Sequence, residues 1–391
     1  MLSHSPLASV SICPGRFVEP IFQTLSDLVA IDSINPAYEG GVPEEDVARY
    51  VERFFAQRGI ETFRQEVLPG RQNVIARLPG RHPRRRVILE AHMDTVSVSG
   101  MTIPPFAPEI RDGCLYGRGS CDTKAGLAAM MHAVAHLKEN NIVPECEIWM
   151  AAVVDEEFAF RGAIKLCDGL EAAAAIVAEP TGMRAVVAAK GVLRWKIRTL
   201  GVAAHSAKPH LGVSAIRDMT PVLEWLNRAA GSLAAPAHPL LGPATLSIGT
   251  IHGGEQINFV PDRCEIAIDR RLIPGEDPLT VWAGYRDSLM SIPGIRAEMD
   301  PPMIADPAME TAADDAVVLT AQRVLEEQGH DPTPGGVPFG SDASKFVRQG
   351  IPAIIFGPGS IDRAHAAIEY VECDQVTAAL NFYIQFLQRF V

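Results

Sequence analysis

A histidine and an aspartate, His92 and Asp94, follow directly on the largely apolar run 87–91. Because side chains repeat with a period of two along a strand, we expect both to leave the strand end on the same side. That placement suits a metal-bound imidazole whose second ring nitrogen is held by a carboxylate. A solvated strand end is the alternative, because a His-x-Asp pair is a short motif.

Acidic residues end two further strand-like segments. The apolar run 148–154 leads into Asp155, Glu156 and Glu157, and the run 172–178 leads into Glu179. Three acids at the end of a buried strand repel one another unless a cation compensates their charge. In an open α/β sheet, ligands bind at the carboxyl ends of the strands, so we expect these acids at one ligand-binding edge.

Two more residues have the chemistry of metal ligands. Asp122 follows a glycine-rich turn at the start of a helix expected to reach about Leu137, where an N-cap is the alternative role. His365 follows a buried strand expected over 352–356 and a Gly-Pro-Gly-Ser turn. The helix after Asp122 also holds His132 and His136 on one face, but without a glutamate after the first histidine we interpret this pair as structural or surface residues.

Together these residues offer two histidines and several carboxylates, the ligand set of a two-metal site. The mixture of nitrogen and oxygen ligands suits zinc, with cobalt or manganese as substitutes. Two metals about 3.5–4 Å apart need a bridging ligand, and Asp122 can serve both. Since Glu156 and Glu157 are adjacent, one can bind metal while the other remains free as a general base.

The elements that must position these residues follow two different patterns of secondary structure. Helices expected at 20–31 and 44–57, then strands at 62–67, 73–78 and 87–92, predict an α/β layer architecture, to which 302–391 returns. Between them, strand, helix, strand, strand, helix and strand follow in order. We therefore predict a mixed-sheet α/β/α catalytic domain (1–184 and 302–391) with an inserted α+β, ferredoxin-like domain (185–301).

Composition excludes several classes of function. The chain has 391 residues and a net charge of −12, which argues against nucleic acid or an anionic membrane as partner. The basic cluster at 81–86 is interpreted as a solvated loop. Seven scattered cysteines indicate reduced thiols, the segment Met1–Gly15 is a poor signal peptide, and no apolar run has the length of a membrane span. These features predict a cytoplasmic protein.

Five motifs occur along the chain in a fixed order: Ala-His-Met-Asp-Thr-Val, Gly-Arg-Gly-Ser-Cys-Asp-Thr-Lys, Asp-Glu-Glu, Ala-Glu-Pro-Thr-Gly and Gly-Pro-Gly-Ser-Ile with Ala-His and Glu-Tyr-Val. From about residue 20 to 390 the chain thereby resembles the dinuclear zinc aminoacylases, a family that includes acetylornithine deacetylase, succinyl-diaminopimelate desuccinylase and glutamate carboxypeptidase. The resemblance implies two divalent metal ions per chain. One would be held by His92, Asp122 and Glu179, and the other by Asp122, Glu157 and His365.

The resemblance also implies roles outside the ligand set. Glu156 would be the general base, Asp94 would orient His92, and the inserted domain would be a lid that forms a homodimer. In such a dimer His205 would stabilise the oxyanion in the partner's active site. The expected substrate-binding residues are Asn258 and Arg271, which would hold a carboxylate, and Gly340 and Ser341, which would line the pocket.

The predicted function is metal-dependent hydrolysis of the amide bond of a small N-acyl amino acid, with acetylornithine as the first candidate. A desuccinylase and a dipeptidase or carboxypeptidase are the alternatives within the enzyme class. A non-catalytic binding protein on the same fold is the alternative outside it, but such a protein would be expected to have lost metal ligands or the base.

Overall fold

A computed structural model of the chain describes residues 19–391 except 293 and 295. The segment Met1–Gly15, which the sequence predicts is not a signal peptide, lies outside the described residues. The helices with α geometry are α1 (Pro20–Ala30), α2 (Glu45–Ala56), α3 (Lys124–Glu139), α4 (Glu156–Ala159), α5 (Arg161–Cys167), α6 (Ala215–Ser232), α7 (Pro278–Met290), α8 (Ala316–Glu327), α9 (Ala343–Arg348) and α10 (Cys373–Arg389).

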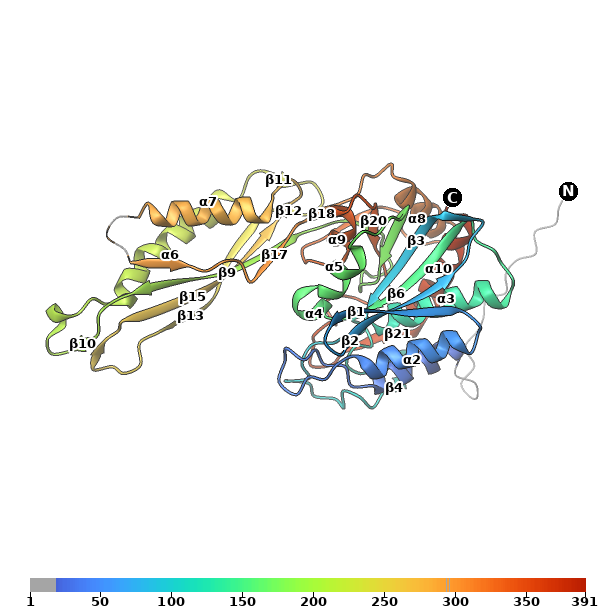
Figure 1. The fold of residues 1–391 in the computed structure, drawn as a ribbon, viewed down its shortest axis with the longest axis horizontal. Helices are drawn as coiled ribbons and strands as arrows, with labels where there is room; N and C mark the ends of the chain where they lie inside the picture. The colour runs from blue at the N-terminus through green and yellow to red at the C-terminus, as the bar shows by residue number, and fades with distance from the viewer. Residues whose placement is uncertain (1–18, 293, 295) are drawn as a thin grey trace.

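A nine-stranded mixed sheet forms the larger lobe on the right of Figure 1. Its strands are, in spatial order, β1 (Glu61–Leu68), β2 (Arg71–Leu78), β6 (Cys146–Val153), β3 (His82–His92), β7 (Ala174–Val177), β20 (Ala353–Ile355), β8 (Val186–Ala189) and β18 (Met309–Glu310), with β19 (Gly335–Val337) also paired to β8. The neighbours β6, β3, β7 and β20 run parallel. Their carboxyl ends therefore meet at one edge of the sheet, where the sequence predicts the ligand site.

Helices cover both faces of this sheet, which confirms the predicted α/β/α architecture. On one face α1, α2, α3, α8 and α10 pack against alternate strand residues such as Val87 and Leu89. On the other face α5 and α9 pack against Ile75 and Ile88. The alternation follows from the period of two along each strand, because both faces of a central strand are buried.

The basic cluster was wrongly predicted to be a loop. Strand β3 already begins at His82, so Arg84, Arg85 and Arg86 form its first half and lie at its solvent-exposed end. Arg86 pairs with the Glu147 carboxylate at 2.9 Å and stacks on the Trp149 ring, both on the neighbouring strand β6. These cross-strand contacts keep a charged segment in the sheet although it has no apolar pattern.

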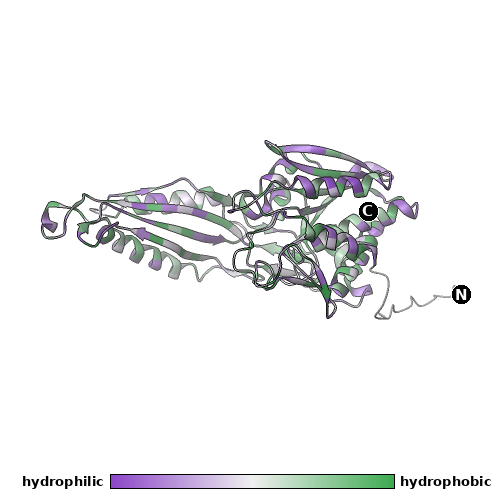
Figure 2. Ribbon diagram, turned by 90° about the horizontal axis from the view of Figure 1, so that it is seen from below, coloured by the Kyte–Doolittle hydropathy of each residue, from purple (hydrophilic) through white to green (hydrophobic). Residues whose placement is uncertain are grey.

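The inserted lobe, here called the lid, has the predicted ferredoxin-like order. Its antiparallel sheet runs β13 (Thr245–Gly253), β15 (Arg263–Leu272), β9 (Gly191–Leu200) and β16 (Ala297–Met299), with β17 (Ile304–Asp306) also on β9. Helices α6 and α7 cover one face through a separate apolar core around Trp195. Figure 2 shows hydrophilic and hydrophobic residues alternating along the long strands, as expected for a sheet with one covered face.

The chain passes from the large sheet to the lid sheet, and later back again, close to the predicted domain limits of 185 and 301. Strand β8 belongs to the large sheet and β9 to the lid, while β17 still belongs to the lid and β18 returns to the large sheet. The crossings therefore fall near residues 190 and 307. The division into two domains remains a prediction, with its limits moved by about five residues.

Three small sheets were not predicted, because strands of two or three residues carry no periodic signal. They are β21 (Tyr370–Glu372) with β5 (Cys114–Tyr116) and β4 (Glu109–Arg111), β10 (Ala204–His205) with β14 (Phe259–Val260), and β11 (Ala237–His238) with β12 (Gly242–Pro243). The short 3₁₀ turn Pro209–Leu211 follows β10. None of the described helices is long and apolar enough to span a bilayer.

The histidine pair on α3 divides into one structural residue, His132, and one residue with a surface contact, His136. The Nε2 of His132 lies 2.8 Å from the Thr24 hydroxyl, and its ring packs against Phe54. Burial, with a smaller contribution from Arg58, lowers the pKa of His132 to about 4. His136 contacts Asn140 one turn further along the same helix.

We expect the low pKa of His132 to make stability fall in acid. The unfolded chain binds a proton near pH 6.5 and the folded chain only near pH 4, so stability decreases as the pH falls through this window. Between pH 7 and pH 5 the wild type should lose about 2 kcal/mol more than the His132→Gln variant, measured by urea unfolding. His136→Gln is the control and should keep the wild-type slope; the same slope in His132→Gln would refute the assignment.

Candidate metal centre

Six predicted ligand and base residues meet at the carboxyl edge of the parallel strands. His92 ends β3, Glu156 and Glu157 open α4 after β6, and Glu179 follows β7. Asp122 lies in the loop before α3, and His365 lies in the loop after β20. Segments far apart in the sequence are thus brought together by the parallel strands and by the loops that follow or precede them.

The potential ligand atoms of the described residues form three groups: two share Asp122, and the third consists of His92, Glu156 and Glu157. His92, Asp122 and Glu179 make one group and Asp122, Glu157 and His365 the other, with ligand atoms within 4.8 Å of one another in each. The Nε2 of His92 lies 3.1 Å from Asp122 Oδ1, and the Nε2 of His365 lies 3.3 Å from Asp122 Oδ2. Asp122 therefore turns one oxygen toward each histidine, the arrangement expected of a bridging carboxylate.

The charges at this edge are unbalanced without a cation. Burial raises the pKa of Glu156 and of Glu179 well above the ordinary value, and neighbouring carboxylates raise it further. Although burial also acts on Asp122, contacts with His365 and His92 lower its pKa. Contacts with Asp122 and Glu157 raise the pKa of His365 to about 10. A cluster of this kind, buried except for the half-exposed His365 and built from imidazole and carboxylate donors, fits divalent metal ions such as zinc.

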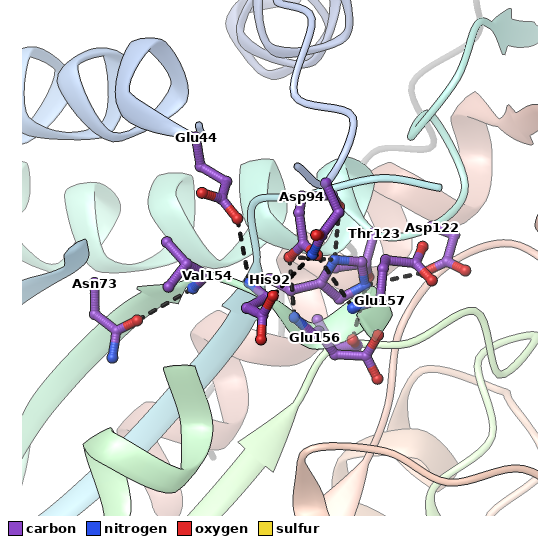
Figure 3. A network of polar contacts seen from close by, with 12 residues as sticks. Glu44, Asn73, His92, Asp94, Asp122, Thr123, Val154, Glu156 and Glu157 are labelled. Carbon is purple, nitrogen blue, oxygen red and sulfur yellow. Dashed lines mark hydrogen bonds and ion pairs between the residues drawn. The ribbon is translucent and has the colours of Figure 1, made fainter. Parts of the chain in front are cut away.

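Asp94 contacts both His92 and the acidic pair, but through different atoms from those expected. The Nδ1 of His92 lies 2.9 Å from the main-chain carbonyl of Asp94 and 3.8 Å from its carboxylate. The carboxylate instead accepts hydrogen bonds from the backbone N–H groups of Glu156 and Glu157, both at 3.1 Å. Figure 3 shows Asp94, Glu156 and Glu157 gathered around His92. Asp94 thus fixes the start of α4 as well as the imidazole.

The first acid of the Asp-Glu-Glu triplet is directed away from the ligand groups. The Asp155 carboxylate lies 3.1 Å from an Arg71 nitrogen and 2.5 Å from the Nε of Arg161, and it also accepts a bond from Asn35. Its backbone is left-handed, with φ of 70°, so the chain turns sharply between β6 and α4. These contacts explain why the two following glutamates, but not Asp155, face the centre.

A buried ion pair supports the loop that carries Asp122. Glu369, from the Glu-Tyr-Val motif, lies 2.6 Å from an Arg118 nitrogen, and both side chains are buried. The other Glu369 oxygen accepts hydrogen bonds from the backbone N–H groups of Cys121 and Asp122, at 3.0 and 3.1 Å. Glu369 therefore holds the backbone on which the bridging carboxylate stands.

We expect Glu369→Ala to lower the free energy of unfolding by about 3–5 kcal/mol, because Arg118 would keep a buried charge without its partner. Urea unfolding measures this change. Glu139→Ala is the matched control, because Glu139 pairs with Arg58 on the surface and should cost about 1 kcal/mol or less. Equal losses in the two variants would show that the buried ion pair contributes no more to the free energy of unfolding than the surface pair.

A cavity of about 310 Å³ opens over the ligand groups. The predicted residues Arg271 and Gly340 line it together with Glu156 and His365. Ser341 is buried beside Gly340, and its hydroxyl accepts a hydrogen bond from the Ala343 backbone. Of the predicted pocket residues, Arg271 and Gly340 therefore face the cavity and Ser341 supports its wall.

His205 and Asn258 are not brought to this cavity. His205 is exposed in β10, which lies at the end of the lid farthest from β6 and α4 in Figure 1. The Asn258 carbonyl accepts a hydrogen bond from the Ser206 backbone, so both residues belong to the same tip. The Nδ1 of His205 accepts a hydrogen bond from the Ala207 backbone at 3.0 Å, which places the ring proton on Nε2.

Two polar residues of the cavity wall were not predicted. Tyr38 lies in the loop after α1, and its hydroxyl donates to the Glu157 carbonyl at 2.9 Å; burial, followed by the charges of Glu157 and Asp94, raises its pKa to about 12. Arg194 lies on β9 and reaches the cavity from the lid. In the sequence Arg194 alternates with Lys196 and Arg198 on one face, and nothing in that pattern marks which of the three meets the site.

Comparisons with known proteins show the family of the chain. The model of peptidase family M20/M25/M40 matches residues 88–389. An acetylornithine deacetylase from Myxococcus xanthus is 31% identical over 90% of this chain and 93% of its own. A protein named probable succinyl-diaminopimelate desuccinylase from Staphylococcus aureus is 28% identical over 94% of this chain and 97% of its own.

Solved structures share the fold. An M20 family metallo-carboxypeptidase from Sulfolobus solfataricus has a TM-score of 0.79 and 20% identity, covering 95% of this chain and 99% of that one. A dinuclear metal binding peptidase of the M20 family from Bacillus subtilis has a TM-score of 0.71 and 16% identity, covering 95% of this chain and 98% of that one. These similarities establish the fold of the chain.

Proposed function

The chain belongs to peptidase family M20/M25/M40 and is a metallohydrolase of the deacylase and peptidase type, and from this premise we propose that it removes the acyl group of a small N-acyl amino acid. The observation that carries the proposal is the pair of ligand groups joined by Asp122; Glu156 belongs to neither of them and lies beside His92 and Glu157. We propose that His92, Asp122 and Glu179 hold one divalent ion and that Asp122, Glu157 and His365 hold the other; the mixture of imidazole and carboxylate ligands suits zinc.

In this proposal each residue has a distinct task. Two divalent ions, when bound, would acidify a water molecule and polarise the scissile carbonyl. Glu156 would take a proton from the water as the water oxygen bonds to the carbonyl carbon, and would give that proton to the leaving nitrogen as the C–N bond breaks. Asp94 keeps Glu156 in place through the backbone and keeps the His92 ring in a fixed tautomer through its carbonyl.

We further propose a homodimer formed through the lid. Strand β13 is an edge strand, and most of its residues are exposed. Ile251 on β13 and Ile216 on α6 are about half exposed, at 53% and 46%. An unpaired edge beside apolar side chains suits antiparallel pairing with a second copy about a two-fold axis. Such a dimer would carry the tip with His205 and Asn258 toward the partner's cavity, where the Nε2–H of His205 would stabilise the oxyanion.

A substrate panel tests the proposed activity. The zinc-loaded protein is assayed with N-acetyl amino acids, with acetylornithine first, and with N-succinyl-diaminopimelate and dipeptides. Cleavage of the acetyl compounds is expected; cleavage confined to the succinyl compound or to dipeptides would support the desuccinylase or peptidase alternative instead. A protein without activity that binds less than one metal per chain would support the non-catalytic alternative.

The proposed location is the cytoplasm, because the six cysteines among the described residues are all unpaired.

A further inference from the structure

Two arginines of the lid share one carboxylate at the cavity wall. The Nε of Arg194 lies 2.7 Å from Asp269 Oδ2, and the Nε of Arg271 lies 2.8 Å from Asp269 Oδ1. The three residues occupy neighbouring positions on the paired strands β9 and β15, with Asp269 directly opposite Arg194. Because each arginine contacts Asp269 through Nε, its terminal nitrogens are available to a ligand.

The charge of this group is suited to one anion. Two guanidinium groups and one carboxylate leave a net charge of +1, and both arginines line the cavity with side chains that are 42% and 26% exposed. Paired arginine donors match the planar geometry of a carboxylate. Asp122, Glu156, Glu157 and Glu179 line the same cavity, but they are committed to the proposed divalent ions and to the base, whereas the two arginines are not. The carboxylate of a substrate is therefore directed to the lid, and the amide bond of the same substrate is directed to the metal centre of the larger lobe.

The rest of the cavity wall is largely apolar. Among the described residues that line it, the charged ones are the metal-centre residues and the two arginines. The apolar lining residues are Val96, Phe158, Phe160, Val192, Ile304, Phe339 and Ile361. A cationic side chain would find no separate carboxylate there, and a second anionic group would exceed the single positive charge of the lid. Burying an unpaired charge is costly, so such substrates are disfavoured.

We infer that the substrate of this site carries one carboxylate, bound by Arg194 and Arg271, and an uncharged apolar side chain held against the apolar wall. The inference rests on the proposed function and refines it. Among N-acyl amino acids it ranks those with apolar side chains above acetylornithine, whose side chain is cationic. Arg194 thereby becomes a specificity-determining residue, with Asp269 fixing its position.

Three substrates with side chains of nearly equal length but different charge test this inference. N-acetyl-L-norleucine, N-acetyl-L-ornithine and N-acetyl-L-glutamate differ mainly at the end of the side chain, and kcat/KM is measured for each with the zinc-loaded protein. We expect norleucine to exceed both others by at least about tenfold. Preference for ornithine or glutamate would overturn the inference and leave the deacylase function standing. Cleavage of none of the three, with metals bound, would overturn the proposed deacylase function and the inference with it.

A pair of variants tests the role of Arg194. Arg194→Gln should raise KM for N-acetyl-L-norleucine about tenfold or more and change kcat less, as expected when a binding contact is lost. Lys196→Gln is the control, because Lys196 lies two residues along the same face of β9 and pairs with Glu265 instead. N-acetyl-L-norleucinamide, which lacks the carboxylate, should be a poor substrate and insensitive to Arg194→Gln. Equal cleavage of acid and amide, or equal effects of the two variants, would refute the arginine pair as the carboxylate site.

Discussion

The Glu156→Gln variant is expected to lose roughly 10²–10⁴-fold in kcat, the contribution of a general base, while it still binds two metals per chain. Glu156 lies beside His92 and Glu157, one residue from each of the two ligand groups that share Asp122, and its amide counterpart has nearly the same shape but accepts no proton from water. KM should change little, because the lost interaction belongs to the transition state. Steady-state kinetics with elemental analysis of the same sample measures both quantities.

Glu157→Gln is the matched comparison, because Glu157 is the next residue and is proposed as a metal ligand. That variant should lose metal as well as activity, whereas Glu156→Gln should lose activity alone. Near-wild-type turnover in Glu156→Gln would assign the base to another residue. Loss of metal from Glu156→Gln would make Glu156 a ligand, a role left open by its proximity to His92 and Glu157.

The His205→Ala variant is expected to lose about 10²–10³-fold in kcat, the usual contribution of one oxyanion donor, although His205 lies at the far tip of the lid in its own chain. Its activity should return on mixing with Glu156→Gln. Random exchange of subunits would place one complete active site in each heterodimer, and roughly a quarter of wild-type activity should be recovered. Activity of the mixture against each parent, with the heterodimer isolated by two affinity tags, measures this recovery.

His210→Ala serves as the control, because His210 lies in the neighbouring 3₁₀ turn of the same tip and has no proposed part in the reaction. It should retain activity without mixing. Absence of recovery in isolated heterodimers would show that His205 acts in its own chain or has no part in the reaction. A chain that stays monomeric in light scattering would also remove the basis for action across subunits.

Much of the fold could be predicted from the sequence because its elements are long and strongly patterned. The helices near 20–31 and 44–57 and the strands that lead to His92 and Glu179 occur where the apolar periodicity places them. The order of helices and strands after residue 190 was sufficient to predict the ferredoxin-like fold of the lid. The candidate ligands could be found because each polar residue interrupts or directly follows an apolar segment.

The remaining features depend on contacts between distant segments. The exposed start of β3 is held in the sheet by Glu147 and Trp149, which the arginine-rich segment itself does not reveal. Arg194 and Tyr38 belong to the site because lid and loop converge on it, and neither has a distinctive local pattern. The contact of His92 with the Asp94 carbonyl, rather than with its carboxylate, depends on the backbone path after the strand.

The metal content of the protein tests the central claim most directly. After removal of metal with a chelator and reconstitution with zinc, the wild type should bind two zinc ions per chain by elemental analysis. Because Asp122 belongs to both ligand groups, Asp122→Ala should bind markedly less than one ion per chain, whereas Glu179→Ala and His365→Ala should each retain about one. Two ions retained by Asp122→Ala, or fewer than one bound by the wild type, would contradict a two-metal centre joined by this aspartate.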